Sequence, residues 1–214
     1  MSSLRFTLLT DGSSDRTLLP ILTWLLQQSG VTADVTGQWA NFSFLRQRPN
    51  ELHERILSAL DLYPCELLFI HRDAEGQGRA ARVSEITQAL NTICLRHQMD
   101  VPAVFVIPVR MQEAWLLIDE HAIRRAAGNP AGNVQFDKPD LGRIEAIPDP
   151  KDRLYNLLRT ASGLTGRKLQ KLRLPMLRHR VAELITDFSP LCNLPAFVAL
   201  QRDLTHILAQ NHWA

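Results

Sequence analysis

The feature that most constrains the fold is a series of short apolar runs, each followed by a polar turn. The clearest run is 101–108 (VPAVFVIP), which is short, rich in β-branched residues and bounded by polar residues, as buried strands are. Runs at 6–10 and 66–71 also end at polar turns, and a weaker run spans 31–39. Because helical patterns separate these runs, the connections must cross over the sheet. The sequence therefore predicts an α/β fold with a mainly parallel sheet flanked by helices.

Apolar spacings of three and four residues predict the helices. In the first part of the chain we expect them near 18–25, 50–60, 79–97 and 113–119. After residue 150 we expect them at 152–160, 167–174, 175–188 and 195–210. The interval between holds four of the twelve prolines and has little periodicity. We predict an α/β core at 1–126, an irregular excursion at 127–150 and a helical, basic C-terminal subdomain at 151–214, packed on the core.

Composition sets the class of protein. A chain of 214 residues with 45% hydrophobic and 21% charged residues can bury one good core. Its apolar runs all fall short of the ~20 residues that span a bilayer, and its first residues lack the pattern of a secretory signal. The three cysteines are far apart, which argues against disulfides and CxxC-type zinc sites. We expect a cytoplasmic protein without membrane contact.

Acidic residues follow several of the predicted strands. Asp11 and Asp15 follow the first run, Asp73 and Glu75 follow the run at 66–71, and Glu113 starts the helix after 101–108. The carboxyl ends of parallel strands meet at one edge of a sheet, where ligands of such folds bind. Clustered carboxylates repel unless a cation relieves them, and Mg²⁺ or Mn²⁺ prefers such oxygen ligands. A magnesium or manganese site is therefore expected at this edge.

Several of these segments resemble motifs of a known protein family. The turn at 11–15 (DGSSD) resembles the Glu-Gly-x-x-Asp/Glu turn that opens Toprim domains, and 73–75 (DAE) resembles their Asp-x-Asp motif. The stretch 107–119 (IPVRMQEAWLLID) is similar to the Glu-Ala-Trp-Leu-Leu signature of a Toprim-related family of largely uncharacterised bacterial proteins, some encoded in anti-phage defence loci. The resemblance covers roughly 4–125, and the last third more loosely.

The resemblance implies a Toprim-like (Rossmann-like) fold and metal-dependent chemistry at nucleic-acid phosphodiesters. Asp11 would take the place of the acid/base glutamate, Asp73 and Glu75 would hold Mg²⁺, with Asp11 nearby as a further ligand, and Glu113 would support the catalytic site. Asp11 is one methylene shorter than the family's glutamate, and Glu75 replaces an aspartate. Either departure would shift the metal or mark a site that binds without cleaving.

Basic residues gather in the last third. Between 159 and 182 there is no Asp or Glu, and seven Lys or Arg occur, among them Arg167, Lys168, Lys171 and Arg173. Such a segment is a footprint for a polyanion. It has no aromatic residue, so we expect contacts to backbone phosphate and not to unpaired bases. The same cations could instead form a solvated face that pairs with acids elsewhere.

Neighbours of these motifs have simpler interpretations as well. Arg72 could bind phosphate or pair with a local carboxylate. His71 is expected to complete a strand end, Trp115 to lie in the core, and Asp15 to support the site or cap a helix. Taken alone, each acidic motif also fits a solvated turn.

Three hypotheses follow for the function. The first is a Mg²⁺-dependent nuclease or phosphotransferase acting on DNA or RNA, in phage defence. The second is a catalytically degenerate Toprim module that binds nucleic acid or a partner protein from a defence locus. The third is a phosphatase or nucleotide-binding enzyme of another α/β family, against which stands the absence of a GxGxxG or GxxxxGK[ST] loop in the sequence.

Overall fold

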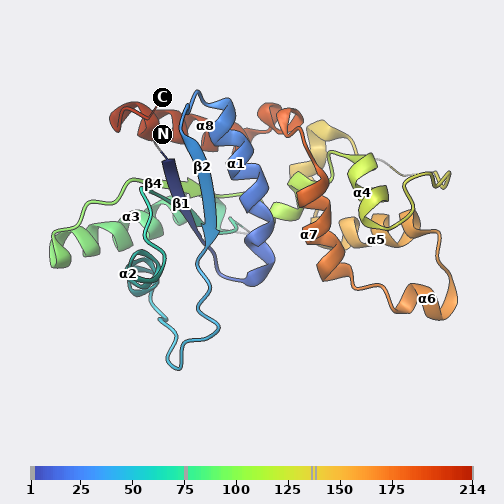
Figure 1. Ribbon diagram of the computed structural model, residues 1–214, viewed down its shortest axis with the longest axis horizontal. Coiled ribbons are helices and arrows are strands. Elements are labelled where there is room, and N and C mark those ends of the chain that lie inside the picture. Colours follow the sequence, from blue (N-terminus) through green and yellow to red (C-terminus); the bar gives the residue numbers. More distant parts are fainter. Residues whose placement is uncertain (1–2, 75–76, 136, 138, 214) are drawn as a thin grey trace.

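The computed structural model describes residues 3–74, 77–135, 137 and 139–213 (Figure 1). The strands are β1 (Ser3–Leu9), β2 (Asp34–Trp39), β3 (Leu67–His71) and β4 (Ala103–Val106). The α-helices are α1 (Leu18–Gln28), α2 (Leu52–Leu62), α3 (Gly78–His97), α4 (Glu120–Ala126), α5 (Pro150–Ser162), α6 (Gly166–Gln170), α7 (Leu174–Leu184) and α8 (Pro195–Gln210). Short 3₁₀ helices are η1 (Ser13–Thr17), η2 (Gln112–Leu116), η3 (Leu141–Ala146) and η4 (Ser189–Asn193).

Within the described residues the strands form one wholly parallel sheet in the order β2-β1-β3-β4. The chain moves outward from β1 to β2, returns to the other side of β1 for β3, and continues to β4. The strand order therefore reverses between β1 and β3. In open parallel sheets this reversal separates the loops at the carboxyl ends and opens a crevice for a ligand.

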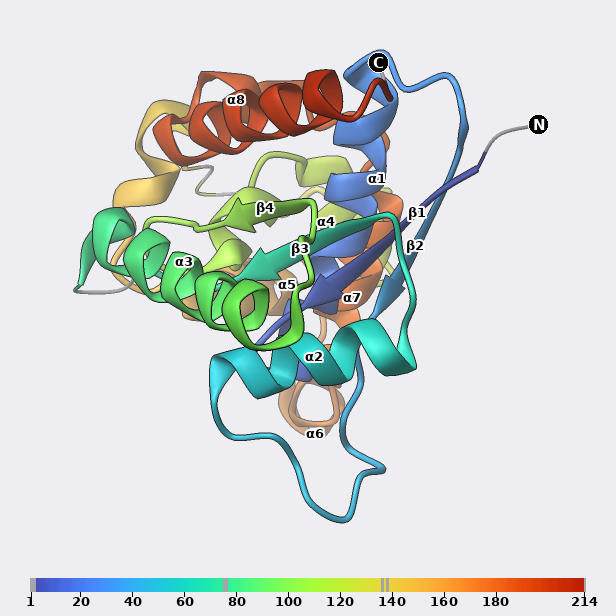
Figure 2. The same ribbon diagram turned by 90° about the vertical axis from the view of Figure 1, so that its left-hand side faces the viewer.

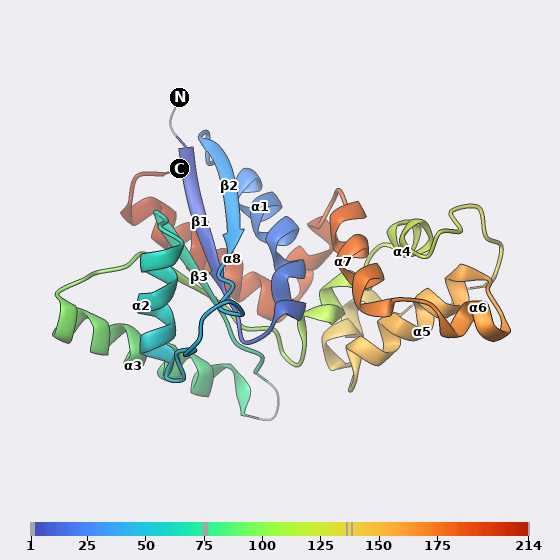
Figure 3. The same cartoon turned by 60° about the horizontal axis from the view of Figure 1, so that its bottom comes forward.

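Helices cover both faces of the sheet, as the strand–helix alternation predicts (Figures 2 and 3). On one face, α1 and α8 pack on alternate side chains of the strands, among them Phe6, Phe69 and Val106. On the other face, α2 and α3 pack on the side chains between, such as Ile70 and Phe105. The α/β class predicted from sequence is confirmed. Among the described helices, none combines the length and hydrophobicity that a membrane crossing requires.

The remaining helices form a group beside the sheet. In Figures 1 and 3, α4, α5, α6 and α7 lie together on one side, whereas α8 returns to the sheet and packs near β4. Side chains of α4, α5, α7 and α8 share one continuous core with α1 and the strands. Packing therefore runs across the predicted boundary at 126–151: α4, from the predicted core segment, contacts α5 and α7, from the C-terminal segment. The division into a core and a C-terminal subdomain stays a prediction.

Three predicted elements differ from the structure. The helix expected at 113–119 is instead η2 followed by α4, because the Asp119 side chain accepts a hydrogen bond from the Ala122 amide at 2.9 Å and caps a new helix. The helix expected to reach Phe188 ends at Leu184. The backbone of Ile185 is extended, and the side chains of Ile185 and Phe188 are buried. The excursion contains η3, which contributes Ile144 to the core.

A glycine on β2 is required by the packing of a core ring. Gly37 lies opposite Phe6 in the β1–β2 register, and a Cβ at Gly37 would lie 2.3 Å from the Phe6 Cζ. That ring is fully buried and meets Phe69 edge to face at 5.3 Å, so it has no room to move. We expect Gly37→Ala to lower the free energy of unfolding by about 1–3 kcal/mol through overpacking.

Urea denaturation would measure that loss. Gly142→Ala is the matched control, since a Cβ there meets only Asp140 Oδ1 at an ordinary 3.5 Å. Equal stability of the two variants would contradict the packing that we describe around Phe6.

Candidate functional site

The acidic residues that follow β1 and β3 do come together at the carboxyl edge of the sheet. Asp11 lies after β1 and Asp73 after β3, on the two sides of the strand reversal. The Asp11 carboxylate contacts Arg72, the residue before Asp73. Gln112, the residue before Glu113, donates a hydrogen bond to Asp15 at 2.8 Å. The segments after β1, β3 and β4 therefore lie side by side at this edge, with Gln112 and not Glu113 making the contact from the third.

The alternation of strand side chains divides this region into two groups. Along β3, Phe69 belongs to the core under α1 and Ile70 to the core under α2 and α3. Because successive side chains point to opposite faces, His71 and Asp73 continue on the α1 side and Arg72 on the α2–α3 side. The same alternation along β1 places Asp11 on the α2–α3 side. The Asp11 and Asp73 carboxylates, expected as ligands of one ion, thus belong to different groups.

Asp11 lies in a cluster of ion pairs on the α2–α3 side. Its Oδ1 atom is 2.6 Å from Arg55 Nη1 and 2.6 Å from Arg72 Nη1, and Arg55 also donates to the Thr10 carbonyl. The other end of the Arg72 guanidinium lies 2.7 Å from Glu85 of α3. Arg72 therefore pairs with local carboxylates, which is the second of its two expected roles.

These contacts set the protonation of Asp11. Burial raises the pKa of its carboxyl, but the Arg55 hydrogen bond and the charges of Arg72 and Arg55 outweigh burial and hold the pKa below its ordinary value. A carboxylate with a lowered pKa accepts a proton poorly at neutral pH. The geometry supports an electrostatic role for Asp11 better than the acid/base role that the resemblance implies.

The segment after β3 is held from α3. Arg82 donates from Nε to the Asp73 carbonyl at 2.9 Å and pairs through Nη1 with Glu85 at 3.0 Å. The amide of Ala74 donates to the Pro108 carbonyl at 3.1 Å, which continues the contacts of β3 with β4. These interactions fix the backbone on which Asp73 is mounted. Glu75 and Gly76 lie outside the described residues, so the role of Glu75 as a ligand stays a prediction.

His71 lies at the centre of the second group. Its ring is almost fully buried, and Nδ1 lies 3.0 Å from the Val106 carbonyl. Since a carbonyl only accepts, Nδ1 carries the proton and Nε2 is turned toward the site. Nε2 lies 3.5 Å from Asp73 Oδ1 and 3.8 Å from Asp15 Oδ2. Histidines that ligate metals or transfer protons are commonly oriented by such an Nδ1–H bond to a carbonyl.

Asp15 is held rigidly in this second group. Its Oδ1 accepts from the Ser14 hydroxyl at 2.7 Å and from Gln112 Nε2 at 2.8 Å, and its Oδ2 accepts from the Gly12 amide at 3.2 Å. The carboxylate is buried and closes the turn at the start of η1. Asp15 thus caps a helical turn, which is one of the two roles expected of it, and its support of the site stays a prediction.

Glu113 has a different environment from the one expected. Its carboxylate and the guanidinium of Arg178 on α7 form an ion pair of 2.6 Å, with 3% and 4% of the side chains exposed. The pair joins η2 to α7 within the core. Glu113 therefore lies next to the site in sequence, but its charge is compensated inside the helical group, and Gln112 is the residue that reaches Asp15.

The donors near His71 are of the kind that a divalent ion takes. Among the described residues, no group of three or more His, Cys, Asp or Glu is arranged to hold a metal ion. Mg²⁺ is commonly bound by one or two carboxylates, with water and substrate phosphate completing its shell. Asp73, which is partly exposed, and Asp15 are two carboxylates that face the same imidazole nitrogen. They fit such an ion in chemical type.

The predicted phosphate-binding residues of the last third lie elsewhere. Arg167 and Lys168 are exposed on α6, and Lys171 and Arg173 are exposed in the turn that leads to α7. Figures 1 and 3 place α6 at the end of the helical group away from the sheet. The structure does not bring these cations to Asp73. Arg178, from the same segment, is buried with Glu113.

Comparison with protein-family models, with curated proteins and with solved structures gives no match for this chain. The Toprim resemblance of the motifs therefore stays a prediction.

Sequence reasoning missed three residues of the site. The sequence favours a strand-end role for His71 over a catalytic one, and it points to neither Gln112 nor Arg55. His71 had a usable signal, since it directly precedes Arg72-Asp73 at the end of a buried strand. Arg55 had none, because it comes from α2 and reaches Asp11 only through the packing of that helix on the sheet.

Proposed function

We propose that the protein is a Mg²⁺- or Mn²⁺-dependent enzyme of Toprim type that acts on nucleic-acid phosphodiesters, as a nuclease or phosphotransferase. The observation that carries the proposal is that Asp15 and Asp73 face His71 Nε2 across the reversal between β1 and β3. Ligand sites of parallel sheets concentrate at this position.

Each residue then has a defined task. Asp73 and Asp15 would hold the ion, which when bound neutralises phosphate charge and lowers the pKa of a bound water. His71, fixed by Val106, presents Nε2 to the same space. Gln112 keeps the Asp15 carboxylate oriented. Arg55 and Arg72, on the neighbouring side, hold the Asp11 carboxylate and the turn that follows β1.

A second candidate function is a module that binds nucleic acid or a partner protein without cleaving. One observation favours it: arginines, and not an ion, compensate the charge of Asp11, the residue in the position of the family's acid/base glutamate. In that case nucleic-acid binding would survive both EDTA and the loss of Asp73.

Cleavage assays separate the two functions. With Mg²⁺ or Mn²⁺ we expect cutting of single-stranded or double-stranded DNA or RNA, abolished by EDTA. Asp73→Asn should reduce the rate at least about 100-fold, since removing even an outer-shell partner of a metal ligand costs 10–100-fold. Asp61→Asn, an exposed aspartate on α2, is the matched control and should retain full activity. A folded protein that cuts none of these substrates with either ion would refute the enzymatic proposal.

Thermal unfolding tests the metal site without an activity readout. An ion that binds only the native state at 100 times its dissociation constant adds about 2.7 kcal/mol of stability. We expect Mn²⁺ to raise the melting temperature of the wild type and of Asp61→Asn, and to leave that of Asp73→Asn nearly unchanged. Equal shifts in all three proteins would place the ion elsewhere.

A further inference from the structure

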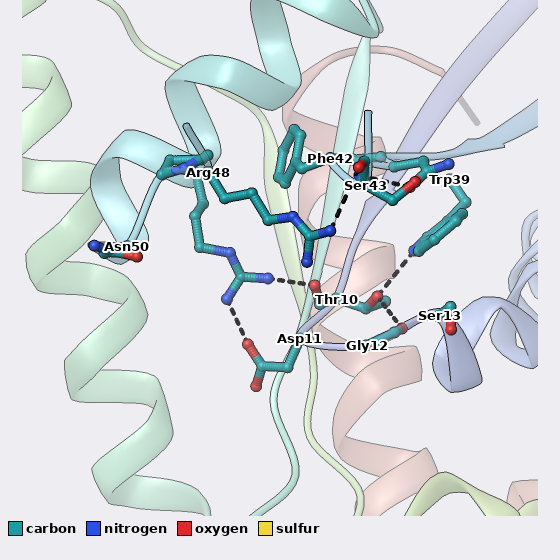
Figure 4. Close-up of a pocket in the computed structure, with 13 residues that line it drawn as sticks. Thr10, Asp11, Gly12, Ser13, Trp39, Phe42, Ser43, Arg48 and Asn50 are labelled. Atoms are coloured by element: carbon teal, nitrogen blue, oxygen red, sulfur yellow. Dashed lines mark hydrogen bonds and ion pairs between the residues drawn. The ribbon is translucent and has the colours of Figure 1, made fainter. Parts of the chain in front are cut away.

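A cavity of about 400 Å³ with a mixed polar and apolar lining opens beside the candidate site, at the carboxyl ends of β1 and β2 (Figure 4). Its floor is the turn that follows β1, including Thr10, Asp11 and Gly12, and its wall is formed by residues 39–43 and 48–50 of the segment that leads from β2 to α2. The volume falls in the range of small-molecule sites. Because Gly12 lines this cavity and its amide donates to Asp15 at 3.2 Å, the cavity adjoins the group around His71.

The wall of the cavity carries two aromatic side chains. The indole of Trp39 donates to Thr10 Oγ1 at 2.9 Å, and that hydroxyl donates to the Gly12 carbonyl at 2.8 Å. The indole is thus fixed against the floor. Phe42 lies further along the wall (Figure 4). Aromatic faces of this kind are the surfaces on which unpaired bases stack.

Arginine accompanies the aromatic side chains. Arg48 extends into the space between Phe42 and the turn at Thr10–Gly12, and donates to the Ser43 carbonyl at 3.4 Å (Figure 4). Arg55 reaches the floor from α2. Two arginines and one aspartate give the charged lining a net charge of +1 (2 − 1). A guanidinium beside aromatic rings is suited to a group that is planar at one end and anionic at the other.

The rest of the segment 39–50 has a fixed base and a tip with exposed aromatic and basic side chains. Its base is fixed, because the Tyr63 hydroxyl donates to the Asn41 carbonyl at 2.9 Å and the Ala40 amide donates to the Leu8 carbonyl at 3.0 Å. Its tip extends from the body of the protein (Figure 2) and exposes 63% of Phe44 to solvent, with Arg46 nearby in sequence and also exposed. An exposed ring and cation outside the cavity continue the surface for a ligand longer than one unit.

We propose that this cavity binds one unpaired nucleotide of a single-stranded nucleic acid, with the base against Phe42 and Trp39 and the phosphate at Arg48. The inference rests on the proposed nucleic-acid substrate and names its class. A base within a duplex is already stacked and paired, so it reaches such a cavity only after it is extruded from the duplex, which costs free energy. Single strands and unpaired loops are therefore the preferred ligands.

Binding is measured in EDTA, so that it is independent of cleavage. The probes are a labelled 12-nucleotide single strand and a blunt duplex of the same sequence, followed by fluorescence anisotropy. We expect the single strand to bind at least tenfold more tightly than the duplex. Competition experiments with unlabelled oligonucleotide, nucleoside monophosphate and inorganic phosphate show whether the ligand is a free nucleotide or a unit within a strand. If it is a unit within a strand, the oligonucleotide must compete far better than the monophosphate or phosphate.

Variants locate the binding. Phe42→Leu keeps an apolar side chain against α2 and removes the ring, and it should weaken single-strand binding about 5- to 100-fold. Arg48→Ala should weaken binding and reduce the slope of log affinity against log salt by about 0.7. Arg143→Ala, an exposed arginine on η3, is the control for lost charge outside the cavity.

The outcomes for this cavity and for the proposed enzyme are distinguishable. Selective single-strand binding without cleavage refutes the enzyme and supports the cavity. Equal affinity for single strand and duplex, or unchanged binding in both Phe42→Leu and Arg48→Ala, overturns the cavity proposal even if the protein cuts nucleic acid. Circular dichroism confirms that each variant is folded.

Discussion

Replacing Glu113 by alanine is expected to lower the free energy of unfolding by about 3–5 kcal/mol, because the guanidinium of Arg178 is then left charged and buried without its partner. Small domains are stable by only about 5–15 kcal/mol in total. Within the described residues Arg178 Nε already has no hydrogen-bond partner, so little remains to compensate the loss. Urea denaturation followed by circular dichroism measures the effect.

Two companion proteins show whether the loss comes from burial of the charge. In the double variant Glu113→Leu with Arg178→Met both charges are absent, and we expect most of the lost stability to return. Arg5→Met removes one partner of the exposed Arg5–Glu66 pair and should change stability little, because water screens that pair. Full stability of Glu113→Ala together with loss of activity would instead favour the catalytic role that the sequence predicts for Glu113.

The environment of Glu113 also changes how the Glu-Ala-Trp-Leu-Leu segment is understood. All five side chains of 113–117 are buried, and the Trp115 ring lies edge-on to Phe197 of α8 at 5.3 Å. The Trp115 indole also donates to Glu145 at 3.2 Å. The segment that carries most of the family resemblance is therefore a junction between the sheet and the helical group. The residue before it, Gln112, donates to Asp15 of the candidate site at 2.8 Å.

Much of the fold could be predicted because its signals are local. The run 101–108 contains β4, and Asp11, Asp15 and Asp73 follow the carboxyl ends of β1 and β3 at one edge of the sheet. The motifs alone do not predict that these acids divide into two groups. Strand alternation does predict it, because Phe69, His71 and Asp73 are two residues apart and their side chains lie on the same, α1-covered side. The motifs indicate which strand each acid follows, whereas the alternation decides which face each acid continues.

Other features depend on packing that no local pattern records. The sequence does not say that Arg55 of α2 reaches Asp11, or that α6 lies away from the sheet. Charge alone pointed to the segment 159–182 as the nucleic-acid contact. The cavity beside Asp11 is instead lined by 39–43 and 48–50, where fewer cations stand next to aromatic side chains. Arginines interspersed with aromatic residues are a weaker sequence signal than a run of Lys and Arg. An arginine beside an aromatic ring nevertheless suits an unpaired base better than a run of cations does.

His71→Asn is expected to leave the fold intact and to reduce phosphodiester cleavage by at least about 100-fold, the lower end of what a general acid or base contributes. The Asn amide can replace Nδ1 as the donor to the Val106 carbonyl, which lies 3.0 Å from the ring. It has no atom in the position of Nε2, so the contacts toward Asp15 and Asp73 are lost. Activity and stability should therefore separate in this one variant.

The reciprocal change makes the assignment decisive. His71→Gln can place a polar atom near the position of Nε2, but it removes the donor to Val106, so we expect lower stability and a partial recovery of activity relative to His71→Asn. Unfolding in urea and initial cleavage rates with Mn²⁺ are measured on both proteins. If His71 only completes the strand end, activity will follow stability, and His71→Asn will be the more active of the two. That order would remove the imidazole from the proposed chemistry and leave the two carboxylates as its basis.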